Sequence, residues 1–409
     1  MRVAIASRIF EPEPSAASFR LAALAEAFAR HGHDVAVLTV RPPAEAGDAR
    51  SSTGTADQAG DDARPYRVLR FPVLRDRSGY VRGYLPYLTF DVPLCLRILF
   101  GPKRDVIIAE PPPTTGFFVR IAAAVRRTPY VYYAADVWSD AASQTGAHRA
   151  VIAILGVVER LAWRGARRII SVSPEVTDRL RVLEPRVDPV TVGNGVDVAR
   201  FQKRIDTSGD APLRGAPAAG FVYAGTASEW HGADILIEAY ARARGRLAGI
   251  PLMFIGGGAE RDRLEHRVDE LGLTESVSFS RALPAEDIGP VLAESVAAVA
   301  TLRPGAGYDF AFPTKLWSSA ACGAPLIHVG PGPAAAFVRT EVDGEPLGEA
   351  VPYDPEAVAA ALVRAAERYR AEGTRPERRD AVRTWAVDHV SLTSVADTVV
   401  RSVSSELSR

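Results

Sequence analysis

Lys315 is the residue of this chain best placed to do chemistry. It stands in FAFPTKLWSSAACGAPLI (residues 310–327), where Pro313 sets a turn before a small-residue helix that ends at Gly323. Unpaired N–H groups and the positive end of the helix dipole attract an anion at a helix start, and an ammonium group adds a point charge there. The segment therefore indicates a diphosphate site, although a buried α/β helix whose one lysine reaches solvent fits the segment equally well.

Further groups suited to binding a phosphorylated ligand lie in turns that follow short apolar segments. Glycines at the ends of strands allow tight turns and let the backbone approach a phosphate closely. His231 could add a hydrogen bond to a phosphate, but a helix-capping role accounts for this residue better. The turns concerned are AGTASEWHG (224–232), GGG (256–258), SRALP (280–284) and PGAGYDFAFPTK (304–315).

Several familiar nucleotide and metal motifs are absent. IGGGAERDRL lacks the G-x-G-x-x-G spacing of a dehydrogenase, and no G-x-x-x-x-G-K-[ST] loop occurs. The 7 histidines form no H-x-x-x-H pair or Cys/His cluster, and there is no D-x-D. We therefore expect no metal ion and no separate cofactor, so that lysine, backbone N–H groups and His231 would meet the charge of a diphosphate.

Two rounds of an alternating strand–helix pattern must position these groups. The first round runs from RVAIAS through DVAVLTV, DVIIAE and YVYYAAD to RRIISVS, and the pattern restarts at GFVYAGT after a linker at 205–219. Such alternation is typical of parallel, doubly wound sheets, and 409 residues suffice for two domains. We expect an α/β fold of two Rossmann-like domains, residues 1–204 and 218–384, facing a central cleft at the carboxyl ends of their strands.

Composition narrows the partners and the compartment. Lys plus Arg equals Asp plus Glu at 49 each, so no overall field draws the chain to nucleic acid or to a membrane. Cys95 and Cys322 stand apart in apolar segments, which indicates buried thiols in a reducing, cytoplasmic compartment. No signal peptide and no apolar stretch of about 20 residues is present. YRVLRFPVLRDRSGYVRGYLPY interleaves arginines with aromatics, which fits an edge strand with a solvated face or, at most, peripheral contact with a lipid-bearing acceptor.

Four sequence blocks, taken in order, resemble the family-four glycosyltransferases of GT-B fold, in particular the bacterial branch that builds surface polysaccharides. The likeness spans nearly the whole chain, and NGVD (194–197) is its most specific part. It implies a retaining, metal-independent transfer of sugar from a nucleoside-diphosphate sugar to a hydroxyl acceptor, and a C-terminal helix at 385–409 that packs back on the first domain. The blocks are FEPEPSAASFRLAALAEAFARHGHDVAVLT, DVIIAEPPPTTG with PYVYYAADVWSD, RRIISVSPEVTDRL with VTVGNGVDVARF, and PTK with AACGAPLI.

The resemblance also implies roles for individual residues. Lys315, with the N–H groups at 314–317, would stabilise the departing diphosphate, and Asp136 would orient the acceptor or stabilise the oxocarbenium face. A strand-end residue that caps a neighbouring loop is an equally good interpretation of Asp136. The second domain would hold the donor through Gly225, Thr226, His231, Gly257, Gly258, Ala282, Leu283, Phe310, Ala311, Phe312 and Ser318, and the first would hold a glycan, lipid-linked or small-molecule acceptor through Ser15, Ala16, Ala17, Glu110 and Trp138.

Three positions depart from the pattern of that family. Ser318 stands where a ribose-binding glutamate is usual, Phe310 replaces the first of two paired glutamates, and residues 230–232 replace an Arg/Lys pair. Two other functions therefore stay open. One is a nucleotide-sugar 2-epimerase, which shares the two-domain architecture but needs acid/base carboxylates and histidines at the sugar. The other is a degenerate, non-catalytic partner protein, which the presence of Lys315 disfavours.

Overall fold

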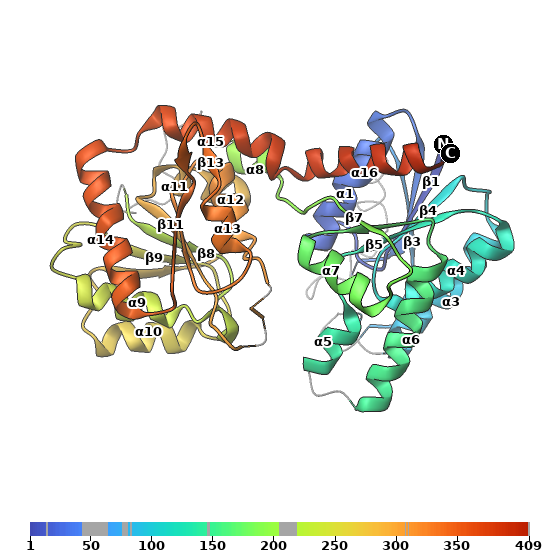
Figure 1. Ribbon diagram of the computed structural model, residues 1–409, viewed down its shortest axis with the longest axis horizontal. Helices are drawn as coiled ribbons and strands as arrows, with labels where there is room; N and C mark the ends of the chain where they lie inside the picture. Colours follow the sequence, from blue (N-terminus) through green and yellow to red (C-terminus); the bar gives the residue numbers. More distant parts are fainter. Residues whose placement is uncertain are drawn as a thin grey trace, which may run out of the picture. The chain divides into compact units, whose positions relative to one another are not determined.

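Figure 1 presents the computed structural model, which describes residues 1–13, 15–42, 64–75, 81, 84–144, 148–203, 219–306, 308–309 and 311–407. Contacts divide the chain into two units: Met1–Asn194 with Leu392–Arg409 form the first unit, and Gly195–Ser391 form the second unit. The strand–helix pattern of the sequence predicts these boundaries at 204 and 384 instead. The predicted linker at 205–219 falls almost entirely outside the described residues.

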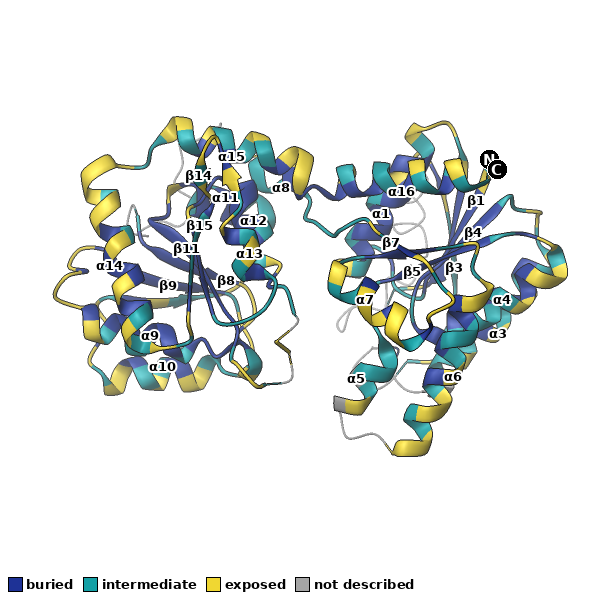
Figure 2. Cartoon of the chain, in the orientation of Figure 1, coloured by how far each residue is buried: buried dark blue, intermediate teal, exposed yellow. Residues whose placement is uncertain are grey.

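The first unit is built on a parallel sheet. Its strands are β1 (Arg2–Ala6), β2 (Asp34–Val40), β3 (Arg67–Phe71), β4 (Val106–Ala109), β5 (Tyr130–Ala134), β6 (Arg168–Ser171) and β7 (Pro189–Thr191). They lie in the order β3-β2-β1-β4-β5-β6-β7. Val3 and Ile5 contact one layer of helices and Ala4 and Ala6 the other, so the central strands are buried on both sides (Figure 2). This explains why they read as continuous apolar segments rather than as an alternating pattern.

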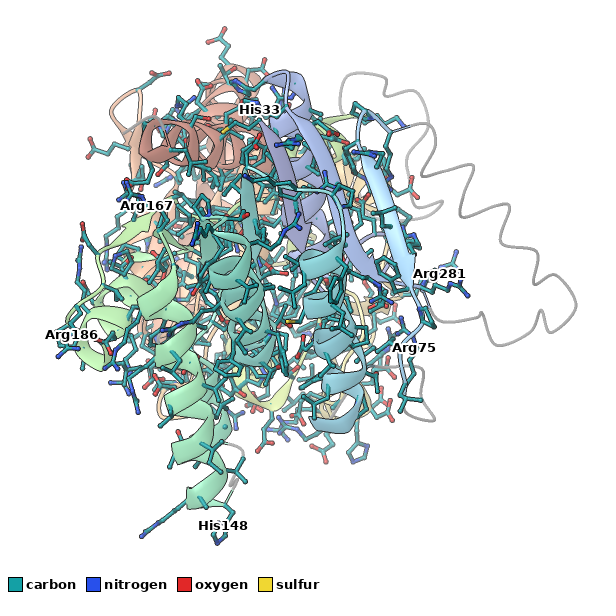
Figure 3. The ribbon with its side chains drawn as sticks, turned by 90° about the vertical axis from the view of Figure 1, so that its right-hand side faces the viewer. His33, Arg75, His148, Arg167, Arg186 and Arg281 are labelled. Carbon is teal, nitrogen blue, oxygen red and sulfur yellow. The ribbon has the colours of Figure 1, made fainter. Side chains whose placement is uncertain are left out.

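Helices cover both faces of the first sheet (Figure 1). They are α1 (Ala16–Arg30), α3 (Tyr84–Phe100), α4 (Pro113–Arg126), α5 (Trp138–Gln144), α6 (Arg149–Gly165), α7 (Pro174–Leu183) and α16 (Leu392–Leu407). α1 and α16 pack on one face, and α3, α4 and α6 pack on the other. Arg167, labelled in Figure 3, holds Glu406 of α16 at 3.0 Å. The carboxyl-terminal helix therefore belongs to the first unit.

The second unit repeats this design. Its main sheet contains β8 (Phe221–Ala224), β9 (Leu252–Ile255), β10 (Val277–Ser280), β11 (Ala297–Thr301), β12 (Leu326–Val329) and β15 (Gly348–Val351), beside a hairpin of β13 (Glu341–Val342) and β14 (Glu345–Pro346). The strand order is β10-β9-β8-β11-β12-β15, and all neighbours in this sheet are parallel. Two parallel α/β sheets in one chain confirm the predicted fold class.

Helices of the second unit also form two layers. They are α8 (Val198–Gln202), α9 (Asp234–Ala243), α10 (Arg261–Glu270), α11 (Ala285–Glu294), α12 (Lys315–Ala321), α13 (Ala334–Val338), α14 (Pro355–Glu372) and α15 (Pro376–His389). α9, α10 and α14 bury their apolar side chains on one face, and α11, α12, α13 and α15 on the other. No helix among the described residues is both long and apolar enough to cross a bilayer.

The unit boundaries differ from the predicted ones because the helices at both crossings, α8 and α15, pack on the second unit. Arg200 of α8 lies 3.0 Å from Glu286, and the amide of Gln202 donates to the carbonyl of Ala321 at 2.9 Å. α15 continues to His389, so the chain returns to the first unit at 391/392 rather than near 385. These long-range contacts leave no local mark in the sequence.

Candidate functional site

The ammonium group of Lys315 is enclosed at the carboxyl end of the second sheet. Its Nζ lies 3.4 Å from the centre of the Tyr223 ring of β8. The residue as a whole is half-buried, but Nζ is fully buried and has no hydrogen-bond partner among the described residues. Burying a cation without an acceptor is unfavourable, so this arrangement favours the binding of an anion.

Burial also shifts the ionisation of this site. Loss of hydration lowers the pKa of Lys315 well below its ordinary value. Burial, and then the charge of Lys315, lower the pKa of His231 to about 3, so the imidazole is neutral. The Nδ1 of His231 accepts a hydrogen bond from Ser228 N at 3.1 Å, and the ring proton therefore resides on Nε2. His231 therefore has the helix-capping role that the sequence favours, at the helical turn Glu229–His231. Its Nε2–H is left as a donor that a ligand could use.

Glycines let two strand ends approach each other beside the lysine. Gly256 has a φ of 153°, and a Cβ atom there would lie 2.1 Å from the carbonyl oxygen of Gly225. A Cβ on Gly258 would lie 2.2 Å from the carbonyl oxygen of Ala227, whereas Gly257 has open space around it. Close approach of backbone therefore requires Gly256 and Gly258. The carboxyl end of the sheet presents backbone rather than side chains at this point.

Part of the predicted amide group at 314–317 is used by the helix itself. The N–H of Leu316 donates to Pro313 O, and that of Trp317 donates to Thr314 O, both at 3.0 Å. The expectation that all N–H groups of this helix start face a ligand is corrected, because the first turn is closed by bonds three residues apart. The N–H groups of Thr314 and Lys315 have no acceptor among the described residues, so they remain as donors.

Ser318 is also tied to the helix start. It is 8% exposed, and its hydroxyl donates to the carbonyl of Lys315 at 3.0 Å. Since that bond uses the only proton of the hydroxyl, Ser318 could only accept a hydrogen bond from a ligand.

The remaining predicted donor residues follow the carboxyl ends of neighbouring strands. Thr226 and Ala282, after β8 and β10, are exposed, and Leu283 packs partly into the core. Phe312 stacks on Trp317 with ring centres 4.2 Å apart, and Ala311 is half-buried. Phe310 lies outside the described residues. Because the strands are parallel neighbours, these turns share one edge of the sheet with Gly225 and Gly257.

In the first unit, Glu110 is the centre of a buried polar cluster. It follows β4, is 3% exposed and forms an ion pair with Arg20 of α1. The hydroxyl of Ser7, after β1, donates to Glu110 at 2.9 Å. Arg20 also lies over the Tyr133 ring at 5.1 Å. Both carboxylate oxygens of Glu110 are thereby satisfied within the protein, so Glu110 positions the strand ends and does not offer a free carboxylate to an acceptor.

Asp136 offers a freer carboxylate at the same edge of the first sheet. It follows β5, keeps more than a third of its surface exposed and has no hydrogen bond to a described residue. Loss of hydration raises the pKa of its carboxyl, and the charge of Arg20 opposes the rise. Asp136 makes no hydrogen bond with a described residue that would cap a neighbouring loop. Its carboxylate is therefore able to contact a ligand.

Trp138 forms part of an aromatic–arginine cluster at the start of α5. Its ring meets Tyr87 of α3 edge-on, with centres 6.0 Å apart, and Arg8 lies 4.7 Å over Tyr87. The backbone N–H of Trp138 donates to the carboxylate of Glu159 at 2.8 Å. Together with Asp136, this cluster forms a surface of mixed polar and aromatic character after β1 and β5.

Ser15, Ala16 and Ala17 form the start of α1, which follows β1. The hydroxyl of Ser15 accepts from Ser18 N at 3.1 Å and so caps the helix. Ala16 is exposed and Ala17 is half-buried. These small residues leave the backbone accessible but supply no charged group.

Sequence reasoning missed three residues that shape these sites. Tyr223 looked like any other apolar strand residue, and nothing local marks its contact with Lys315. Arg20 stands four residues before Leu24, on the apolar face of α1, and this break in the pattern could have revealed its burial. Asp91 of α3 is fully buried, and burial raises the pKa of its carboxyl to about 6. A lone acid in an apolar helix was the available signal.

Comparison with known families divides the chain in the same way as its contacts. The family described as "Glycosyl transferase 4-like domain" matches residues 16–195, and the family described as "Glycosyl transferases group 1" matches residues 218–368. The two matches together cover most of the chain.

Solved structures share the whole fold. The Anabaena protein HepE in complex with UDP superposes with a TM-score of 0.67 at 18% identity, covering 99% of this chain and 100% of that one. Sucrose-phosphate synthase from Thermosynechococcus elongatus gives a TM-score of 0.67 at 16% identity, covering 100% and 99%. At these identities the likeness concerns the fold alone.

One curated relative is similar over a shorter stretch. It is the GDP-mannose-dependent alpha-(1-6)-phosphatidylinositol monomannoside mannosyltransferase of Mycolicibacterium smegmatis, 31% identical over 116 residues. The match spans 28% of this chain and 30% of that relative. The two family matches and the two parallel-sheet units lead to one assignment: the chain belongs to the glycosyltransferases of GT-B fold.

Proposed function

We propose that this glycosyltransferase moves a sugar from a nucleoside-diphosphate sugar to a hydroxyl acceptor with retention of anomeric configuration, in the cytoplasm and without a metal ion. The observation that carries the proposal is the buried Nζ of Lys315, which has no hydrogen-bond partner among the described residues and lies beside the glycine turns after β8 and β9. Further support comes from relatives: structures of HepE contain UDP, or UDP with glucose, and the mycobacterial relative is named as GDP-mannose-dependent.

In the proposed reaction the bond between the anomeric carbon and the diphosphate oxygen breaks, and the diphosphate keeps the electron pair. The acceptor oxygen bonds to the anomeric carbon on the same face, and its proton passes to the departing phosphate oxygen. Charge grows on the diphosphate as the bond breaks, so Lys315, the N–H of Lys315 and the neutral Nε2–H of His231 would stabilise the transition state more than the ground state.

The proposed acceptor site lies in the first unit, after β1 and β5. There Asp136 would accept a hydrogen bond from an acceptor hydroxyl, and Trp138 with Tyr87 would provide aromatic surface for a sugar ring. The acceptor class we propose is a glycan, a lipid-linked saccharide or a small hydroxylated molecule.

Calorimetric titration with UDP, GDP, ADP and dTDP tests the donor site. We expect one of these to bind, and Lys315→Ala to weaken its binding at least tenfold, about 1.4 kcal/mol, because a charge-assisted contact is lost. Lys103→Ala removes an exposed lysine of the first unit and should leave the affinity unchanged. Equal affinity of Lys315→Ala and wild type would refute the phosphate role.

A second experiment distinguishes a glycosyltransferase from a 2-epimerase and from a non-catalytic partner protein. The protein is incubated with the nucleotide-sugar whose nucleotide it binds. A transferase releases the nucleoside diphosphate and, with an acceptor, forms a product whose anomeric coupling constant by NMR matches that of the donor. An epimerase converts the donor to its C2 epimer without releasing nucleotide. A degenerate partner protein leaves the donor intact.

A further inference from the structure

A second pocket of the second unit lies at the edge of the sheet opposite Lys315. Its volume is about 320 Å³, which lies within the range of small-ligand sites. Ala297, Leu326 and Gly348, the first residues of β11, β12 and β15, line it together with side chains of α14 and α15. The pocket is therefore at the amino ends of the strands, whereas the glycine turns follow the carboxyl ends.

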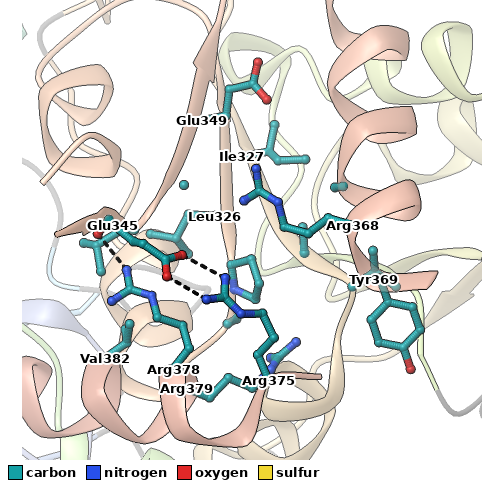
Figure 4. A pocket seen from close by; sticks show the side chains of 18 of the residues that line it. Leu326, Ile327, Glu345, Glu349, Arg368, Tyr369, Arg375, Arg378, Arg379 and Val382 are labelled. Atoms are coloured by element: carbon teal, nitrogen blue, oxygen red, sulfur yellow. Dashed lines mark hydrogen bonds and ion pairs between the residues drawn. The ribbon is translucent and has the colours of Figure 1, made fainter. Parts of the chain in front are cut away.

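Arginines dominate the charge of this pocket (Figure 4). Five arginines line it, against two carboxylates, Glu345 and Glu349. Arg375 binds Glu345 through two nitrogen atoms, at 2.6 and 2.8 Å, and Arg364 pairs with Glu349. An excess of three positive charges remains, carried by Arg368, Arg378 and Arg379.

None of these three arginines has a carboxylate in ion-pair contact among the described residues. Arg378 donates to the carbonyls of Val342, Glu345 and Pro346, so it is held in place by neutral acceptors. Arg379 is 5% exposed and donates to the carbonyls of Ala293 and Ser295 at 2.7 and 2.6 Å. Burial lowers the pKa of Arg379 to about 10, which still leaves it charged at neutral pH.

Arg368 is the arginine most available to a ligand. It is exposed on α14 and makes no hydrogen bond or ion pair with a described residue, yet it lies close enough to Glu345 to help lower the pKa of that carboxyl. In Figure 4 its guanidinium points into the space between α14 and the strands, on the side facing Ile327. Its five donors are thus directed at the pocket without a competing partner.

Apolar side chains form the rest of the wall, including Val296, Leu326, Leu347 and Val382, with Tyr369 at one side. We propose that this pocket binds a small phosphate monoester with an apolar or aromatic body. A phosphate dianion would take the excess charge through a forked contact from Arg368 and the charge of Arg378, and the body would bury against the aliphatic wall. The volume suits a free metabolite of this class rather than a macromolecule.

Phenyl phosphate is a suitable probe, titrated into the full-length protein and followed by saturation-transfer NMR and calorimetry. We expect saturable binding at least tenfold tighter than that of inorganic phosphate, and none with phenol, because both the charge and the ring contribute. Arg368→Glu should weaken binding at least tenfold; this exposed side chain has no structural partner to lose, so the fold should be retained. Arg244→Glu, which reverses the charge of another exposed arginine of the second unit outside the pocket lining, is the matched control and should bind normally.

Lys315→Ala distinguishes this pocket from the proposed nucleotide site. We expect that variant to bind phenyl phosphate with wild-type affinity, whatever becomes of its nucleotide binding. Binding that is lost in Lys315→Ala and kept in Arg368→Glu would overturn the inference, and so would the absence of saturable binding to wild type.

Discussion

The unpaired ammonium of Lys315 predicts a conflict between stability and binding. We expect Lys315→Met to raise the unfolding free energy of the ligand-free second unit by about 1–3 kcal/mol, since that is the cost of an unsatisfied buried polar group. Methionine keeps the contact with the Tyr223 ring. The same variant should lose tenfold or more in nucleotide affinity. Urea denaturation and calorimetry measure both effects, with Lys103→Met as control; a less stable Lys315→Met would contradict the argument.

The lowered pKa of Lys315 predicts that nucleotide binding is coupled to the uptake of protons. Anion binding favours the charged lysine and raises its lowered pKa, so nucleotide binding should take up protons at pH values between the pKa of the free protein and that of the complex, and should tighten as the pH falls through this range. His231 cannot contribute, because its pKa of about 3 keeps it neutral. Titrations in buffers of different ionisation enthalpy count the protons. If the Lys315→Met variant still takes up protons on binding nucleotide, a group other than Lys315 is responsible for the uptake.

Among the secondary-structure elements, the contact of α3 with α4 depends on the protonation of Asp91. Thr115 of α4 donates to this fully buried acid at 2.6 Å, while its other oxygen has no hydrogen bond to a described residue. Burial raises the pKa from 3.8 to about 6, so Asp91 contributes stability that is full below pH 4 and is lost as the pH rises through 6.

Asp91→Asn should therefore stabilise the first unit by up to about 3 kcal/mol at pH 8 and by much less at pH 4. The amide keeps the acceptor for Thr115 and adds a donor toward Thr114, whose hydroxyl also faces this side chain. Urea denaturation at both pH values measures the difference. Asp188→Asn, at a highly exposed acid, should have no effect at either pH. Destabilisation at pH 8 would mean that Asp91 is needed as a carboxylate.

At the scale of the whole molecule, the stability of the first unit depends on α16, which comes from the other end of the chain. Ala396, Val399, Val400 and Val403 are buried against the first sheet and α1. Full burial of one aliphatic side chain contributes about 1.5–3 kcal/mol, so the stability lost on removing the helix is comparable to that of an ordinary domain. We expect truncation after Ser391 to abolish the thermal transition of the first unit.

Differential scanning calorimetry tests this expectation. Added nucleotide raises only the transition of the second unit, by mass action, and so identifies it. Arg401→Ala, an exposed change on the same helix, should leave both transitions in place. Two intact transitions after truncation would show that α16 is dispensable.

Periodicity in the sequence was enough to predict two parallel α/β sheets, because strands buried on both sides are apolar along their whole length. The local sequence also singled out Lys315, because a lysine that follows a proline turn and precedes a small-residue helix is recognisable within a few residues. The glycines at 256 and 258 were recognisable for the same reason. Their restriction, by contrast, comes from the carbonyls of Gly225 and Ala227, which follow β8 and lie more than 20 residues away in the sequence.

The amino-acid sequence by itself thus determined the two sets of alternating strands and helices and singled out the residues that we propose bind a diphosphate, because helix and strand periods and turn residues act over a few positions. Only the tertiary structure decided which of those residues are free to act. Lys315 of α12 lies over Tyr223 of β8, Glu110 after β4 pairs with Arg20 of α1, and five arginines of α14, α15 and the turn between them line one pocket. Such burial and charge balance depend on contacts between distant segments, which no local pattern encodes.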